Sequence, residues 1–217
     1  MTETLRDLVE LSIVVDPTYG QNCYVIHRRD TRDVLVIDPG LQHPRVLDLL
    51  DRGDLRCERI LLTHGHGDHV SGVPALREAQ HCTAAIHPDD REQLMFVSFL
   101  PGIPEDLPEV VIDEELQGGQ IIGWKGLDIE VMHTPGHTRG SVCFHVGPDL
   151  VSGDTLFRRG VGRADLPGGD WPSLVFSLEN KVYALPPETV VYPGHGPQTT
   201  IREEQELNPF VVHPRFR

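Results

Sequence analysis

Residues 63–69 hold three histidines and one aspartate, and the segment reads Thr-His-Gly-His-Gly-Asp-His. Imidazole and carboxylate groups are the usual protein ligands of zinc and of other first-row metals. Side chains two residues apart in an extended chain point the same way, so His64, His66 and Asp68 can converge on one point. The two glycines allow the backbone to turn tightly between them. The spacing predicts a metal-binding loop, and the alternative is a polar surface loop that happens to be rich in histidine.

Three later turns resemble this segment, because each follows a strand-like run and carries one more candidate ligand. The turns are residues 134–138 with His137, residues 152–155 with Asp154, and residues 193–196 with His195. One such turn alone is weak evidence for a ligand. Four of them, each at the end of an apolar run, indicate side chains held by rigid strand ends around one preorganised site.

Short runs rich in Val, Ile and Tyr and two amphipathic segments predict the elements that hold these turns. The predicted strands are residues 11–15, 23–27, 34–38, 60–62, 121–124, 127–132, 141–146, 150–152 and 190–192. The predicted helices are residues 43–52, one from residues 68–70 to about residue 80, and one long helix with an apolar stripe of Leu174, Leu178, Val182 and Leu185. Periodicity alone predicts an α/β or α+β fold.

Residues 94–115 are apolar at first and contain three prolines, at positions 101, 104 and 108. Prolines at this density predict irregular structure. Such a segment packs onto a core by default; the alternatives are a lip over an active site or a contact between the subunits of a homodimer.

Composition excludes several classes of protein. The chain has 217 residues, of which 39% are hydrophobic, and its formal net charge is −14. No run reaches the 18 or so apolar residues of a membrane span. Residues 1–7 are polar, so we expect no signal peptide and a cytoplasmic protein whose four separated cysteines are reduced and buried. The acidic balance disfavours nucleic acid as a partner.

The candidate ligands and the segments around them resemble the metallo-β-lactamase fold superfamily, and glyoxalase II-like hydrolases most closely. The shared segments are residues 36–40, 133–138, 153–157, 160–163 and 192–196, within a similarity that covers roughly residues 10–212. The resemblance implies that His64, His66 and His137 hold one metal, that Asp68, His69 and His195 hold a second, and that Asp154 bridges the two. It also implies zinc, with iron or manganese as alternatives. Asp38 is either a support beneath the metal loop or only a turn, and His133 is structural.

The same resemblance implies an α+β fold, a four-layer αβ/βα sandwich of two mixed sheets with outer helices. We expect residues 1–217 to form a single domain, without the separate C-terminal helical domain that binds glutathione in longer relatives. Asp154 stands where β-lactamases of the commonest class have a cysteine, which argues against antibiotic hydrolysis.

The function that the resemblance implies is cleavage of a thioester of the S-lactoylglutathione type by a metal-bound hydroxide, as in hydroxyacylglutathione hydrolases. Asp68 would orient the hydroxide, and Arg163 would bind the substrate, although Asp165 stands where the family has a tyrosine. A thiol has a pKa near about 8.5, so it can leave without a general acid. Two alternatives remain, a persulfide dioxygenase with one iron and a lactonase or other ester hydrolase of the same fold.

Overall fold

The computed structural model describes residues 9–210, and the chain divides into two compact units at the boundary between Leu116 and Gln117. Each unit has its own six-stranded sheet and its own hydrophobic core. The expectation of a single domain stays a prediction. Residues 1–7, where no signal-peptide pattern was found, lie outside the described residues.

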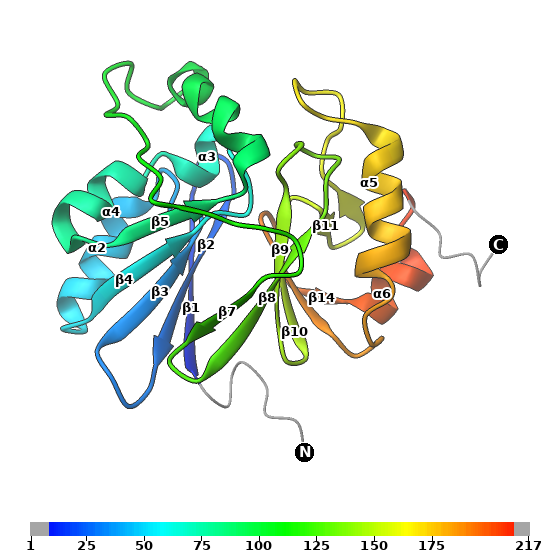
Figure 1. Ribbon diagram of the computed structural model, residues 1–217, viewed down its shortest axis with the longest axis horizontal. Coiled ribbons are helices and arrows are strands. Elements are labelled where there is room, and N and C mark those ends of the chain that lie inside the picture. Colours follow the sequence, from blue (N-terminus) through cyan, green and yellow to red (C-terminus); the bar gives the residue numbers. More distant parts are fainter. Residues whose placement is uncertain (1–8, 211–217) are drawn as a thin grey trace. The chain divides into compact units, whose positions relative to one another are not determined.

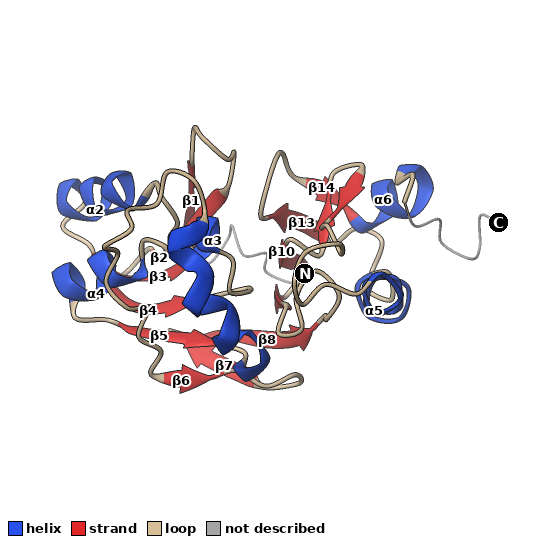
Figure 2. Ribbon diagram, turned by 90° about the horizontal axis from the view of Figure 1, so that it is seen from above, coloured by secondary structure: helices blue, strands red, loops and turns tan. Residues whose placement is uncertain are grey.

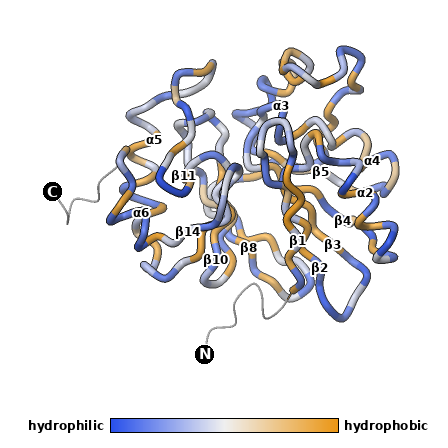
Figure 3. The backbone as a smooth tube through the Cα atoms, turned by 180° about the vertical axis from the view of Figure 1, so that it is seen from behind, coloured by the Kyte–Doolittle hydropathy of each residue, from blue (hydrophilic) through white to orange (hydrophobic). Residues whose placement is uncertain are grey.

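The sheet of the first unit keeps its six strands in chain order (Figure 1). The strands are β1 (Val9–Val15), β2 (Asn22–Arg28), β3 (Asp33–Ile37), β4 (Arg56–Leu61), β5 (Thr83–Ile86) and β6 (Glu114–Glu115). Strands β1 to β3 are antiparallel, whereas β3 to β6 run parallel to one another. The strands before β6 are hydrophobic over much of their length (Figure 3), and β2, β3 and β5 are buried along most of theirs.

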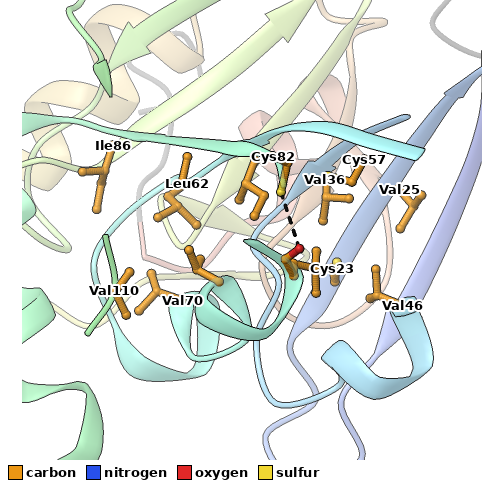
Figure 4. Packing of buried hydrophobic residues seen from close by; sticks show 14 of the residues in the cluster. Cys23, Val25, Val36, Val46, Cys57, Leu62, Val70, Cys82, Ile86 and Val110 are labelled. Atoms are coloured by element: carbon orange, nitrogen blue, oxygen red, sulfur yellow. Dashed lines mark hydrogen bonds between the residues drawn. The ribbon is translucent and has the colours of Figure 1, made fainter. Parts of the chain in front are cut away.

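Two helices pack on this sheet, α2 (His43–Arg52) and α4 (Val73–Gln80), and Figure 2 shows them side by side. Val46, Leu50 and Leu76 of these helices are fully buried in one cluster with the strands. The same cluster contains three of the four cysteines (Figure 4). All four cysteines are free and buried, as predicted, and the predicted bounds of α2 are confirmed.

The single helix predicted from about residue 68 to residue 80 is wrong, because the chain forms two helices. The short α3 (Gly67–Val70) ends before Gly72, and α4 starts again at Val73. Pro74 lacks an N–H and therefore suits the first turn of a helix but not its interior. Gly72 is also held away from a continuous helix, since its N–H donates to the carbonyl of Pro39 at 2.7 Å.

The segment predicted as irregular from residue 94 begins instead inside η1 (Pro88–Phe99), a series of 3-10 turns. This part of the prediction is wrong, whereas the proline-containing stretch from Pro101 to Pro108 has no regular structure. Val97 and Ile103 are buried in the core of the first unit, as expected of the default interpretation. Met95 and Phe99 are exposed.

The second unit has a sheet in the order β14-β13-β10-β9-β8-β7, in which only β10 and β13 are parallel neighbours. Its strands are β7 (Ile121–Trp124), β8 (Leu127–His133), β9 (Val142–Val146), β10 (Asp149–Gly153), β13 (Val190–Pro193) and β14 (Thr199–Thr200). A small hairpin of β11 (Leu156–Phe157) and β12 (Gly160–Val161) follows β10.

The long helix predicted in this unit is shorter and ends in a wide turn. It consists of α5 (Trp171–Ser177) and η2 (Leu178–Val182), whose geometry is π-helical. In a regular α-helix, each side chain in a series spaced by four residues lies about 40° further around the helix axis than the one before. A π-helical turn has more residues per turn and so offsets this rotation. Leu174, Leu178 and Val182 are therefore all fully buried, while Leu185 lies beyond the helix. A last helix, α6 (Ile201–Leu207), was not predicted.

The fold class predicted from the resemblance is confirmed: α+β, with two mixed sheets flanked by helices. Among the helices of residues 9–210, none is long and apolar enough to cross a membrane.

Candidate metal centre

The predicted metal loop lies in the first unit after β4, and its last two ligands, Asp68 and His69, lie in α3. The His64 ring centroid lies 4.8 Å from that of His66 and 4.1 Å from that of His69. Asp68 Oδ2 is 3.8 Å from His69 Nε2. His64 and His69 are buried, whereas His66 and Asp68 are partly accessible. The four ligands predicted from this loop are thus brought together within one unit.

Asp38 supports this loop from the end of β3. Its Oδ2 accepts a hydrogen bond from His69 Nδ1 at 2.9 Å, and its Oδ1 accepts one from the Thr63 N–H at 2.8 Å. A carboxylate can only accept, so the proton of the neutral His69 ring lies on Nδ1 and the lone pair lies on Nε2. This is the arrangement in which a carboxylate orients a metal-binding imidazole. Of the two interpretations left open for Asp38, the geometry favours the support.

Thr63 extends the same network to His64. The Thr63 hydroxyl lies 2.6 Å from Asp38 Oδ2 and 3.0 Å from His64 Nδ1. Its single proton goes to the carboxylate, so the hydroxyl oxygen accepts the proton of His64 Nδ1. His64 therefore also presents Nε2 for ligation. Thr63 was not singled out from the sequence, because its role depends on an aspartate 25 residues earlier.

A close backbone contact explains why residue 40, the last of the 36–40 segment, is a glycine. A Cβ at this position would lie 1.8 Å from the carbonyl oxygen of Asp68. The backbone of the turn that follows Asp38 therefore presses against the backbone of the metal loop. A side chain at residue 40 would push the loop away from its support.

The second unit holds the other three predicted ligands around one carboxylate. Asp154 Oδ2 lies 3.6 Å from His137 Nε2 and 3.5 Å from His195 Nε2. Asp154 and His195 follow the parallel strands β10 and β13, and the Gly194 N–H donates to the Gly153 carbonyl at 2.8 Å. Neighbouring strand ends thus place this pair of ligands. Both imidazoles thus converge on the same carboxylate oxygen.

His137 is oriented from behind by the backbone of residue 163. Its Nδ1 lies 2.7 Å from the Arg163 carbonyl oxygen, so Nδ1 carries the proton and Nε2 faces Asp154. A Cβ on Gly162 would lie 1.9 Å from the Asp154 carbonyl oxygen and 2.9 Å from His137 Nδ1. The glycine before Arg163 is required by this close approach.

The Arg163 side chain, the predicted substrate contact, already has a partner. Its Nε and Nη2 donate to the two carboxylate oxygens of Asp165, each at 2.9 Å. This bidentate pair lowers the pKa of Asp165 and raises that of Arg163. Both side chains are about two-thirds exposed, at 67% and 69%. A substrate carboxylate would have to compete with Asp165 for this guanidinium.

His133 Nε2 lies 2.9 Å from the Arg139 carbonyl oxygen, and the His133 carbonyl accepts a hydrogen bond from Lys181. Its structural role stays a prediction. Asp90, in contrast, was missed. It is fully buried, and its Oδ2 accepts a hydrogen bond from the Gly65 N–H at 2.8 Å. Its position in an acidic first helical turn gave no signal of this contact.

The donor sets of both units fit a divalent metal ion. Nitrogen donors come from imidazoles whose Nδ1 is already bonded, and oxygen donors come from carboxylates beside them. This mixture of neutral nitrogen and anionic oxygen suits zinc, iron and manganese.

Comparison with known proteins decides the family. The model of the metallo-beta-lactamase superfamily matches residues 16–195. The chain belongs to the metallo-beta-lactamase superfamily. An uncharacterized protein of Mycobacterium leprae is 39% identical over 88% of this chain and 93% of its own length. Hydroxyacylglutathione hydrolase GloC of Haemophilus influenzae is 33% identical, over 94% of this chain and 98% of its own length.

Solved structures of this superfamily have the same fold. BLEG-1 B3 metallo-beta-lactamase matches with a TM-score of 0.83 and 33% identity, covering 93% of this chain and 99% of its own. TTHA1623 in a di-iron-bound form matches with a TM-score of 0.82 and 36% identity, covering 92% and 100%. ETHE1 from Myxococcus xanthus matches with a TM-score of 0.79 and 30% identity, covering 92% and 83%. The predicted metallo-β-lactamase sandwich is confirmed.

Proposed function

We propose that this member of the superfamily is a metal-dependent hydrolase that cleaves a thioester of the S-lactoylglutathione type. The observation that carries the proposal is that three candidate ligands are already oriented for metal binding. Asp38, Thr63 and the Arg163 carbonyl each contact Nδ1 of one imidazole, in His69, His64 and His137 respectively, which leaves Nε2 to bind metal. Similarity to GloC over nearly the full length of both chains supports the choice of substrate class.

The proposed centre holds two divalent ions. His64, His66 and His137 would bind one ion, Asp68, His69 and His195 would bind the other, and Asp154 would bridge them. This division rests on family membership and on the local geometry of each ligand set. Zinc is the expected metal, and iron or manganese would also suit the oxygen-rich set. When bound, such a pair supplies a water-derived nucleophile near neutral pH and an electrophile for the substrate carbonyl.

The protein's own side chains would orient the attacking water and bind the substrate. Asp68 has two carboxylate oxygens, so one can ligate while the other accepts the proton of the attacking water and fixes its direction. Arg163 would pair with a carboxylate of the substrate in place of Asp165. A thiolate can leave without a proton donor, because a thiol has a pKa near about 8.5. The motifs contain no group placed to protonate an amine, which favours a thioester over an amide.

A persulfide dioxygenase is the second candidate, and similarity to ETHE1 from Myxococcus xanthus supports it. The persulfide dioxygenase alternative implies a single iron held by two His and one Asp. Seven ligands, with Asp154 between two imidazoles, favour the dinuclear hydrolase instead.

We further expect a cytoplasmic enzyme, acting on a small molecule and not on nucleic acid or membrane, with a homodimer as an open alternative to a monomer.

The experiment that tests the proposal is one panel of substrates offered to protein of measured metal content. S-lactoylglutathione, a simple alkyl thioester, a lactone, a β-lactam and glutathione persulfide are each assayed, with thiol release, ring opening and oxygen consumption as readouts. Thiol release from the thioesters, with no oxygen consumed on the persulfide, is the expected result. Oxygen consumption with sulfite release, and no thioester cleavage, would replace the hydrolase with the dioxygenase.

A further inference from the structure

The η1 segment and the residues that follow it pack against the metal loop, in addition to the support from Asp38. Two glycines separate the ligands of this loop, and each lies against that segment. A Cβ on Gly65 would lie 2.7 Å from Gln93 Cβ and 2.8 Å from the Asp90 carbonyl oxygen. A Cβ on Gly67 would lie 2.9 Å from the Val97 carbonyl oxygen.

Asp90 makes a polar contact between these two elements beside Gly65. Its Oδ2 accepts the Gly65 N–H at 2.8 Å, and the residue is 0% exposed. Gly65 lies between His64 and His66, so this hydrogen bond fixes the peptide that links two proposed ligands of one metal. A carboxylate acceptor in a buried place makes a strong, charge-assisted hydrogen bond.

Asp90 is itself held in place. It lies in the first turn of η1, which His87 caps by accepting the Asp89 N–H. Further along, Val97 and Ile103 anchor the segment in the core of the first unit. The carboxylate therefore has a rigid base, as an orienting group requires.

We propose that Asp90 is a positioning residue that holds the peptide between His64 and His66 in the geometry needed for metal binding. The inference rests on the proposed metal centre, but it concerns a contact that exists without metal. Asp38 orients the imidazole of one ligand, whereas Asp90 orients the backbone between two others. Outer partners of metal ligands typically contribute 10–100-fold to metal affinity.

Three variants test the proposal. Asp90→Ala removes the acceptor, Asp90→Asn keeps a carbonyl oxygen but not the charge, and Asp51→Asn makes the same chemical change at an exposed position of α2. We expect the dissociation constant for Zn²⁺, measured by competition with a chromophoric chelator, to rise about 10–100-fold in Asp90→Ala, less in Asp90→Asn and not at all in Asp51→Asn.

Two further readouts separate positioning from general stability. Hydrogen exchange of the Gly65 amide in the metal-free protein should be faster in both Asp90 variants, with core amides of β2 and β4 unchanged. The visible spectrum of the Co²⁺-loaded protein should change in Asp90→Asn, because the ligand geometry around the ion changes. If Asp90→Ala does not fold, Asp90→Asn supplies both readouts.

The outcomes distinguish the inference from the proposed function. A wild-type chain that binds no Zn²⁺ would overturn the proposed centre, whatever the variants do. A wild-type chain that binds Zn²⁺, with the same affinity, spectrum and Gly65 exchange in Asp90→Asn, would overturn the role of Asp90 alone.

Discussion

Replacing Asp38 with asparagine should weaken metal binding, because it changes the hydrogen bonds that orient His69. Asp38 is 1% exposed, and its carboxylate accepts three hydrogen bonds, two from Thr63 and one from His69. Asparagine can keep the bond from the Thr63 N–H through its carbonyl oxygen. Its NH₂ group then occupies the place of Oδ2, where it meets the Thr63 hydroxyl and His69 Nδ1.

This reversal changes which nitrogen of His69 carries the proton. A donor at the Oδ2 position requires His69 Nδ1 to accept, so the proton moves to Nε2 and that nitrogen can no longer bind metal. We therefore expect metal affinity to fall by about 100-fold, the upper end of what an orienting partner contributes. Two hydrogen bonds to a charged group contribute about 3–6 kcal/mol together, which is the upper limit of the stability loss in the metal-free protein.

The assay combines a metal titration with imidazole NMR. Zn²⁺ affinity is measured by chelator competition, urea unfolding gives the stability of the metal-free form, and ¹⁵N shifts of the His69 ring report the tautomer. Asp54→Asn is the matched control, because Asp54 also has a positive φ, 50° against 53° for Asp38, but is exposed. Unchanged affinity and an unchanged His69 tautomer in Asp38→Asn would refute the assigned network.

Three further predictions follow from the second unit. Asp154→Ala should lower metal content and activity together by elemental analysis and kinetics, while His133→Ala should spare both; full occupancy without Asp154 would mean that the bridge is misassigned. Arg163→Ala should raise KM for S-lactoylglutathione, and Asp165→Ala should lower it by freeing the guanidinium, with metal content unchanged; one KM for all three proteins would remove this arginine from the substrate site. Glu204→Ala should destabilise the protein by about 1–3 kcal/mol in urea unfolding, because its fully buried carboxylate accepts hydrogen bonds from Thr199 and Asn208, which would lose this acceptor; a loss near zero would contradict that account.

Local patterns predicted the elements whose periodicity is unbroken. Ile121–Trp124 and His43–Arg52 have the predicted bounds, since alternation and an amphipathic stripe each extend over the whole element. Two of the errors lie in helices. Pro74 marks the new start within the predicted 68–80 helix, and the helix that carries Leu174 ends in a π-type turn.

The candidate ligands were visible in the sequence because glycines and a fixed ligand order mark them. Of their supports, Asp38 was one of two open interpretations and Asp90 was missed, because each acts across a long sequence separation. Asp38 and His69 are 31 residues apart, and Gly65 and Asp90 are 25 apart. No local pattern predicts that two such residues meet, since the meeting depends on the neighbouring parallel strands β3, β4 and β5. The pairing of Arg163 with Asp165 was also open, because it depends on the local turn.

The most direct test of the proposed metal-dependent hydrolase is a titration of metal-free protein with Zn²⁺, Fe²⁺ or Mn²⁺, with bound metal and thiol release from S-lactoylglutathione measured in the same samples. We predict that activity rises with bound metal, that both reach their plateau at two equivalents per chain, and that a chelator removes and added metal restores both. Thioester cleavage that is complete without metal, or its absence from protein carrying two equivalents, would contradict the account.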